Sequence, residues 1–74
     1  MTTVMMELKV NQQPFFISVN STVTELLTQW SGLPLSELKV AVALNQQVLA
    51  KVQWPTQQLQ AQDELLIFNL VAGG

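Results

Sequence analysis

The strongest local signal in this chain is one helix start, and strand patterns lie on both sides of it. Thr22-Val23-Thr24-Glu25 fits a capping box, in which Thr22 is the N-cap and Glu25 reaches back to its backbone N–H. Gly32 suits the position after a helix, and Pro34 lies just beyond it. The apolar residues between them recur at i, i+3, i+4 and i+7, on one helix face: Val23, Leu26, Leu27 and Trp30. The sequence therefore predicts a helix of about three turns that docks one apolar stripe.

The segments around this helix have the patterns of strands. Apolar and polar residues alternate over 4–10 and again over 15–19, and a turn at 11–14 joins them into a hairpin. After the helix, residues 39–44 predict a buried strand, 45–47 a turn and 48–49 a short return strand. Trp54-Pro55 and Leu59 predict an irregular segment anchored in the core, and a turn at 62–63 leads into a last strand, 64–71. This order predicts an α+β fold, in which a mixed sheet of four to five strands wraps on one helix.

Composition excludes several classes of function. A chain of 74 residues is one small domain, and 49% hydrophobic residues are enough for one core. Cysteine is absent, which excludes disulfides and thiolate metal sites. The basic residues are Lys9, Lys39 and Lys51, which do not cluster, so we expect no nucleic-acid partner. No apolar run is long enough for a membrane span and no signal peptide is evident, so the expected address is the cytoplasm, with no membrane partner.

The chain also lacks the groups of an autonomous catalyst. It has no histidine, cysteine or tyrosine, and its serines lack a partner of suitable pKa. Asp63 and Glu64 are neighbours in sequence, and neighbours on a strand point to opposite faces, which disfavours a carboxylate or metal site. Gly32, Gly73 and Gly74 do not form a phosphate-binding loop. We therefore expect no catalytic residue and no metal of its own.

The unusual feature is the end of the chain, Ala72-Gly73-Gly74. One interpretation is a frayed terminus. The other is that the terminal carboxylate is the reactive group, and that the two glycines, which lack Cβ atoms, can enter a narrow channel in another protein. Three extended residues reach roughly 10 Å. The residues alone leave both interpretations open.

Several motifs together resemble a known family. The strand and helix order with a terminal Gly-Gly resembles the ubiquitin-like β-grasp fold. More narrowly, the chain is similar to the ThiS family, the bacterial sulfur carriers of thiamine biosynthesis, from about residue 5 to its end. The similar stretches are Thr22-Val23-Thr24-Glu25-Leu26-Leu27, Val42-Ala43-Leu44-Asn45-Gln46-Gln47-Val48, Trp54, Leu59, Asp63-Glu64-Leu65-Leu66-Ile67-Phe68 and Val71-Ala72-Gly73-Gly74.

The resemblance implies a β-grasp domain over 1–71 and a flexible tail over 72–74. A ThiF-type adenylating enzyme, using ATP and magnesium, would adenylate the carboxylate of Gly74. Sulfur from a cysteine desulfurase persulfide would convert it to a thiocarboxylate, and thiazole synthase would take up that sulfur. Ala72, Gly73 and Gly74 would thread into these partners. The chain itself would bind no cofactor stably and would not be an enzyme.

The chain departs from the family pattern at two places. Members often have glycine in the turn before the last strand, where this chain has Ala61-Gln62-Asp63-Glu64. If that turn needs a positive φ, Gln62 is strained there by roughly 1 kcal/mol or more. Members also often have Pro-Arg after the short return strand, where this chain reads Leu49-Ala50-Lys51, so a partner contact by Lys51 is open.

The last strand presents two possible faces. Polarity alone would bury Leu66, Phe68 and Leu70, because the other face carries Asn69. The register of the resembling family instead buries Leu65 and Ile67. We follow the family register, which leaves an exposed apolar ridge of Leu66, Phe68 and Leu70 as a partner-binding surface. The alternative, Phe68 as a core residue, stays open.

Trp30 and Trp54 each lie among apolar residues without basic neighbours, so we interpret both as core anchors. Two other functions share the expected fold. A molybdopterin synthase small subunit typically has Pro-Pro before its tail, where this chain has Asn69-Leu70. A ubiquitin-like modifier would form isopeptide bonds to lysines. A plain interaction domain, in which the glycines have no role, is the third alternative.

Overall fold

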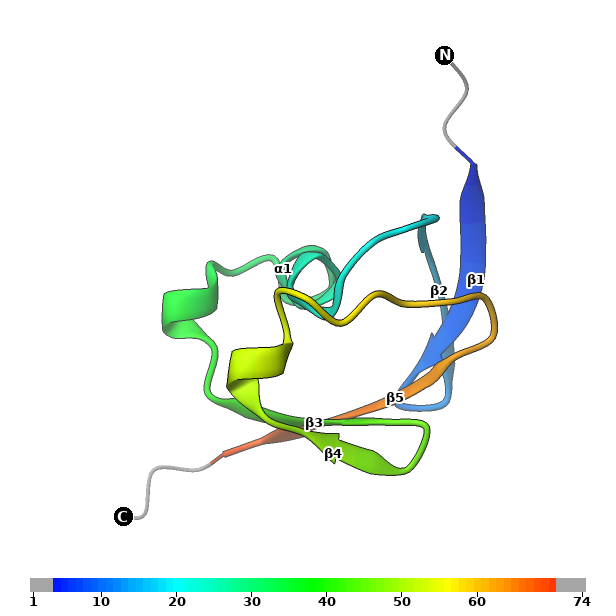
Figure 1. The fold of residues 1–74 in the computed structure, drawn as a ribbon. Helices are drawn as coiled ribbons and strands as arrows, with labels where there is room; N and C mark the ends of the chain where they lie inside the picture. The colour runs from blue at the N-terminus through cyan, green and yellow to red at the C-terminus, as the bar shows by residue number, and fades with distance from the viewer. Residues whose placement is uncertain (1–3, 71–74) are drawn as a thin grey trace.

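The computed structural model describes residues 4–70. Its fold is built on a single mixed β-sheet. Its strand order is β2-β1-β5-β3-β4, with β1 and β5 parallel at the centre and the other pairs antiparallel. The elements are β1 (Met5–Val10), β2 (Gln13–Ser18), α1 (Val23–Ser31), η1 (Leu35–Glu37), β3 (Val40–Leu44), β4 (Gln47–Leu49), η2 (Lys51–Gln53) and β5 (Glu64–Asn69). The helix α1 covers one face of the sheet (Figure 1). The predicted α+β architecture is confirmed.

Helix α1 begins and ends as its sequence predicts. The backbone N–H of Glu25 donates to Thr22 Oγ1 at 3.3 Å, and the backbone N–H of Thr22 donates to Glu25 Oε1 at 3.1 Å. Gly32 takes the left-handed conformation, with φ of 73°, and its N–H donates to the carbonyl of Thr28. The cap and the glycine satisfy backbone groups that a helix end leaves without partners.

The core lies between α1 and the inner face of the sheet. It contains Met6, Leu8, Val10, Ile17, Val23, Leu26, Leu27, Leu38, Val40, Val42, Trp54, Leu59, Leu65 and Ile67. The irregular segment after η2 closes the core beside the helix start. The N–H of Val23 donates to the carbonyl of Gln57, and the N–H of Thr24 donates to the carbonyl of Trp54. The prediction that Trp54 and Leu59 anchor this segment is confirmed.

Trp30 is not a core anchor, and that prediction is wrong. The side chain is 37% exposed, against 2% for Trp54. Trp30 is the penultimate residue of α1, and the chain turns away at Gly32 toward the exposed Leu33. The i+7 position therefore lies beyond the reach of the sheet that buries the first two turns.

The first hairpin differs from its predicted bounds because its turn is tighter. Only Asn11 and Gln12 form the turn, both with positive φ, so β2 already begins at Gln13 and includes Pro14. Val19 lies beyond the end of β2 and is exposed. Positive φ at both central residues is the requirement of the type I′ hairpin turn.

Strand β2 forms one edge of the sheet, and Pro14 lies on it opposite Lys9. The N–H of Val19 donates to the carbonyl of Val4, so alternate pairs along this hairpin are hydrogen-bonded: Val4 with Val19, and Val10 with Gln13. The pair of Lys9 and Pro14 falls between hydrogen-bonded pairs. The ring nitrogen of Pro14 therefore faces the open edge and removes no bond from the ladder.

Candidate functional site

Strand β5 has one buried face and one exposed face. Leu65 and Ile67 are buried, whereas Leu66, Phe68 and Leu70 are 37%, 53% and 56% exposed. The predicted register of β5 is therefore confirmed, and Phe68 is not a core residue. Leu65 and Ile67 belong to the core beneath α1, and successive strand residues point to opposite faces, so the apolar ridge lies on the sheet face away from α1. An exposed apolar row on so small a domain is typical of a binding surface.

The neighbours of the ridge on β3 are small. Ala41 is the Cα partner of Phe68, and Ala43 is the Cα partner of Leu66. Ala43 also pairs with Val48 of β4, which is 79% exposed. Directly opposed residues of antiparallel strands share a face, so Val48 extends the apolar surface across three strands. Sequence analysis missed Val48, because a strand of three residues is too short to show which face is buried.

Two turn asparagines hold the backbone of β5. Asn45 accepts a bond from the N–H of Glu64 at Oδ1 (2.9 Å) and donates from Nδ2 to Asp63 Oδ1 (3.1 Å). Asn11 accepts a bond from the N–H of Ile67 at Oδ1 (2.8 Å), and its Nδ2 lies 3.4 Å from the carbonyl oxygen of Ile67. These long-range bonds leave no local sequence pattern, and sequence analysis missed both.

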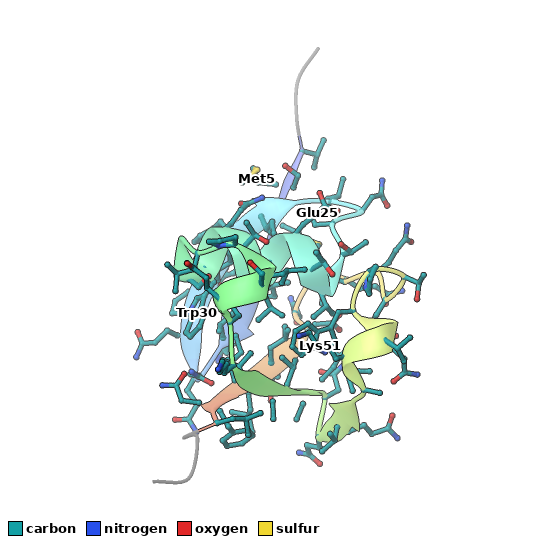
Figure 2. The ribbon with its side chains drawn as sticks, turned by 90° about the vertical axis from the view of Figure 1, so that its left-hand side faces the viewer. Met5, Glu25, Trp30 and Lys51 are labelled. Carbon is teal, nitrogen blue, oxygen red and sulfur yellow. The ribbon has the colours of Figure 1, made fainter. Side chains whose placement is uncertain are left out.

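The carboxylate of Asp63 accepts one bond within its own turn and one from the turn between β3 and β4. Its Oδ2 accepts a bond from the backbone N–H of Gln60, and its Oδ1 accepts the bond from Asn45. Within residues 4–70, no group of three or more histidine, cysteine, aspartate or glutamate side chains is arranged to hold a metal ion. Figure 2 shows Met5, Glu25, Trp30 and Lys51 spread over the molecule rather than gathered at one site.

Three of the predicted site residues, Ala72, Gly73 and Gly74, lie outside the described residues, as does Val71. The division into a domain over 1–71 and a tail over 72–74 therefore stays a prediction. The ridge is the part of the predicted site that the structure places, on the last strand before these residues. Among the helices of residues 4–70, none has the length and hydropathy to span a membrane.

Comparison with solved structures defines the class of protein. The fold matches a thiamine biosynthesis protein (ThiS) from Geobacter metallireducens with a TM-score of 0.76 and 27% identity, covering 93% of this chain and 100% of that one. The protein–protein complex of subunits 1 and 2 of a molybdopterin-converting factor from Helicobacter pylori matches with a TM-score of 0.55 and 23% identity. That match covers 96% of this chain and 100% of the matched chain, and shows the fold alone. The chain is a ubiquitin-like β-grasp protein.

Comparison of sequences is more specific. The model of the ThiS family matches residues 3–74. The sulfur carrier protein ThiS of Escherichia coli strain K12 is 35% identical over 69 residues, which are 93% of this chain and 100% of that protein. The chain belongs to the ThiS family.

Proposed function

We propose that this chain is a sulfur carrier of thiamine biosynthesis, in which Gly74 bears the sulfur as a thiocarboxylate. The observation that carries the proposal is the family match, which runs through residue 74 and so includes Gly73 and Gly74. Identity of 35% over the whole length of the E. coli sulfur carrier supports it. A carrier of this family is a protein substrate of other enzymes and not an enzyme itself.

The chemistry begins with activation of the carboxylate. An α-carboxyl has a pKa of roughly 3.3–3.7, so it is anionic at neutral pH and a poor electrophile. In the proposed reaction a carboxylate oxygen of Gly74 attacks the α-phosphorus of ATP and pyrophosphate leaves. The product is an acyl adenylate, a mixed anhydride. In this proposal a ThiF-type adenylating enzyme supplies the ATP site and magnesium.

Sulfur then replaces the adenylate. A persulfide, charged by a cysteine desulfurase, attacks the acyl carbon with its terminal sulfur, and AMP leaves. A thiol reduces the resulting acyl disulfide to the thiocarboxylate, and that thiol becomes part of a disulfide. Thiazole synthase is the proposed acceptor of the sulfur, and the cytoplasm is the proposed compartment. Ala72 has only a methyl group and Gly73 has no side chain, which suits a narrow channel to a partner's active site.

The residues of the folded domain serve recognition. The apolar ridge lies on the strand that leads into the tail, so a partner that binds Phe68 and Leu70 also receives Gly74. The chain has a formal net charge of −2 and few charged residues, so shape and apolar contact dominate such an interface. Lys51 is exposed at the start of η2 and is available for a polar contact.

The choice of acceptor rests on family membership. The molybdopterin synthase alternative is less supported, because Asn69-Leu70 stands where that subunit typically has Pro-Pro. A ubiquitin-like modifier is the other alternative. Each of these predicts a different product from Gly74, which makes the product the decisive measurement.

The test is mass spectrometry of the chain after incubation with a ThiF-type adenylating enzyme, ATP, magnesium and a persulfide donor. We expect one sulfur to be gained in exchange for one oxygen at Gly74, and thiazole formation when thiazole synthase and its other substrates are added. Deletion of Gly74 is expected to abolish both. Conjugates on lysine would instead identify a modifier, and an unchanged mass would contradict the proposal. Sulfur transfer to a molybdopterin precursor but not to thiazole would assign the carrier to molybdopterin synthesis instead.

A further inference from the structure

Strand β1 accompanies β5 along only part of its length. The parallel register pairs Lys9 with Glu64 and Val10 with Leu65, and the chain then enters the turn at Asn11 and reverses into β2. The remaining residues of β5 have β3 on one side and no strand on the other. This unaccompanied half carries Phe68 and leads to Leu70 and the tail.

The directions of the backbone groups show which residues of β5 are affected. The N–H of Asn45 donates to the carbonyl of Glu64, and the N–H of Leu70 donates to the carbonyl of Lys39. Even-numbered residues of β5 therefore bond toward β3. The N–H of Asn11 donates to the carbonyl of Leu65, so odd-numbered residues bond toward β1. Ile67 is the first odd-numbered residue that β1 does not reach.

The side chain of Asn11 occupies the place of the missing strand. Its Oδ1 accepts from the N–H of Ile67 at 2.8 Å, and its Nδ2 lies 3.4 Å from the carbonyl oxygen of the same residue. A carboxamide has the donor and acceptor of a peptide group, so it continues the ladder by one residue. Without it, Ile67 would have an unpaired N–H on the side away from β3, at a residue only 7% exposed.

We propose that Asn11 is a positioning residue for the activation of Gly74. It acts through Ile67: by bonding that peptide group it holds the unaccompanied half of β5 as a strand, with Phe68 and Leu70 already ordered when the adenylating partner arrives. This inference rests on the proposed carrier function. A segment that must order on binding costs affinity, so Asn11 lowers the KM of the partner for this chain.

Asn45 provides a matched control within the same molecule. Asn11 and Asn45 each hold the first position of a two-residue turn, with φ of 52° and 48°, and a glutamine with positive φ follows each. Each uses its carboxamide on β5 or the turn before it, Asn45 at Glu64 and Asp63 and Asn11 at Ile67. Glycine accepts positive φ, so Asn11→Gly and Asn45→Gly each keep the turn and remove only the carboxamide.

Amide hydrogen exchange tests the structural step without any partner. In Asn11→Gly we expect faster exchange at Ile67 and Asn69, with the amides of α1 unchanged. In Asn45→Gly we expect faster exchange at Glu64 instead. Unchanged protection of Ile67 in Asn11→Gly would overturn the inference. If Asn11→Gly does not fold, Asn11→Asp takes its place. Its carboxylate still accepts from the N–H of Ile67 but places an oxygen beside the carbonyl oxygen of that residue, so we expect a smaller loss of protection, and unchanged protection would again overturn the inference.

The functional step is measured as carrier-dependent ATP–pyrophosphate exchange by a ThiF-type enzyme, at a temperature where all variants are folded. We expect Asn11→Gly to raise the KM for the carrier about tenfold with little change in kcat, and Asn45→Gly to keep both values of the original chain. Equal KM values for the two variants would show that Asn11 is merely structural. If the unsubstituted chain supports no exchange, the proposed function itself fails, and the positioning role fails with it.

Discussion

Ala41 and Phe68 face each other across the antiparallel pair of β3 and β5, a small side chain opposite a large one. An alanine cannot cover a phenyl ring, and Phe68 is consequently 53% exposed on the sheet face opposite α1. The exposure of the ring is therefore built into the pairing of two strands and does not depend on a mobile loop.

Phe68→Asp is expected to leave folding intact, because the ring is exposed in the free chain. It is expected to weaken binding to the adenylating partner by about tenfold or more, because the proposed complex buries this ring. Calorimetric titration with a ThiF-type enzyme and circular dichroism measure the two effects. Val52→Asp is the control, since Val52 is 82% exposed on η2, outside the sheet, and should bind normally. Unfolding of Phe68→Asp would show that the ring belongs to the core.

Gln62→Gly is expected to stabilise the domain by up to about 1 kcal/mol. Gln62 has a φ of 69°, which glycine adopts without a Cβ penalty, and its backbone N–H keeps its bond to the carbonyl of Glu7. Urea unfolding measures the gain. Gln60→Gly, two residues earlier and without a positive φ, should destabilise instead. Equal effects of the two substitutions would argue that Gln62 is not strained.

The two tryptophans are expected to differ in their contribution to stability. Trp54→Ala should cost about 3–5 kcal/mol, because it opens a cavity at a side chain that is 2% exposed. Trp30→Ala should cost about 1 kcal/mol, because much of that ring already faces water. Urea unfolding followed by circular dichroism compares them without relying on tryptophan fluorescence. Equal losses would contradict the assignment of Trp30 to the surface.

Thr22→Ala is expected to cost about 1 kcal/mol, because the N–H of Glu25 loses the hydroxyl that caps it. Glu25→Gln is the control, since a glutamine side chain can still accept the bond from the N–H of Thr22 and a capping box tolerates either residue. Thermal unfolding of both variants checks the difference. A Thr22→Ala variant as stable as the original would show that the cap is dispensable here.

Local patterns predicted the parts of the fold that depend on neighbours in sequence. The alternation in β1, the capping box at Thr22 and the glycine stop at Gly32 all describe interactions within a few residues, and the structure has each of them. The prediction that Trp30 lies in the core was wrong for the opposite reason. Its helical spacing is correct, but tertiary packing decides how far along the helix the sheet covers the apolar face.

Polarity alone did not predict which face of β5 is buried. Asn69 lies on the same side as Leu65 and Ile67, yet it is exposed, because the core ends at Ile67. Because Asn69 lies just past the end of the buried face, a count of polar residues assigns the wrong face to the core. The register of the resembling family gave the correct face. The bond from the N–H of Ile67 to Asn11 Oδ1 spans 56 positions in sequence, so no window along the chain could reveal it.

Pro14 on the edge strand β2 affects how the protein behaves at high concentration. A second chain that added itself to this edge would need a regular row of donors, and the ring interrupts that row near the start of β2. Stacking of copies into fibrils is thereby discouraged at the longer of the two sheet margins. In the proposed pathway the carrier binds several enzymes in turn, and it stays available to them only while its copies remain separate.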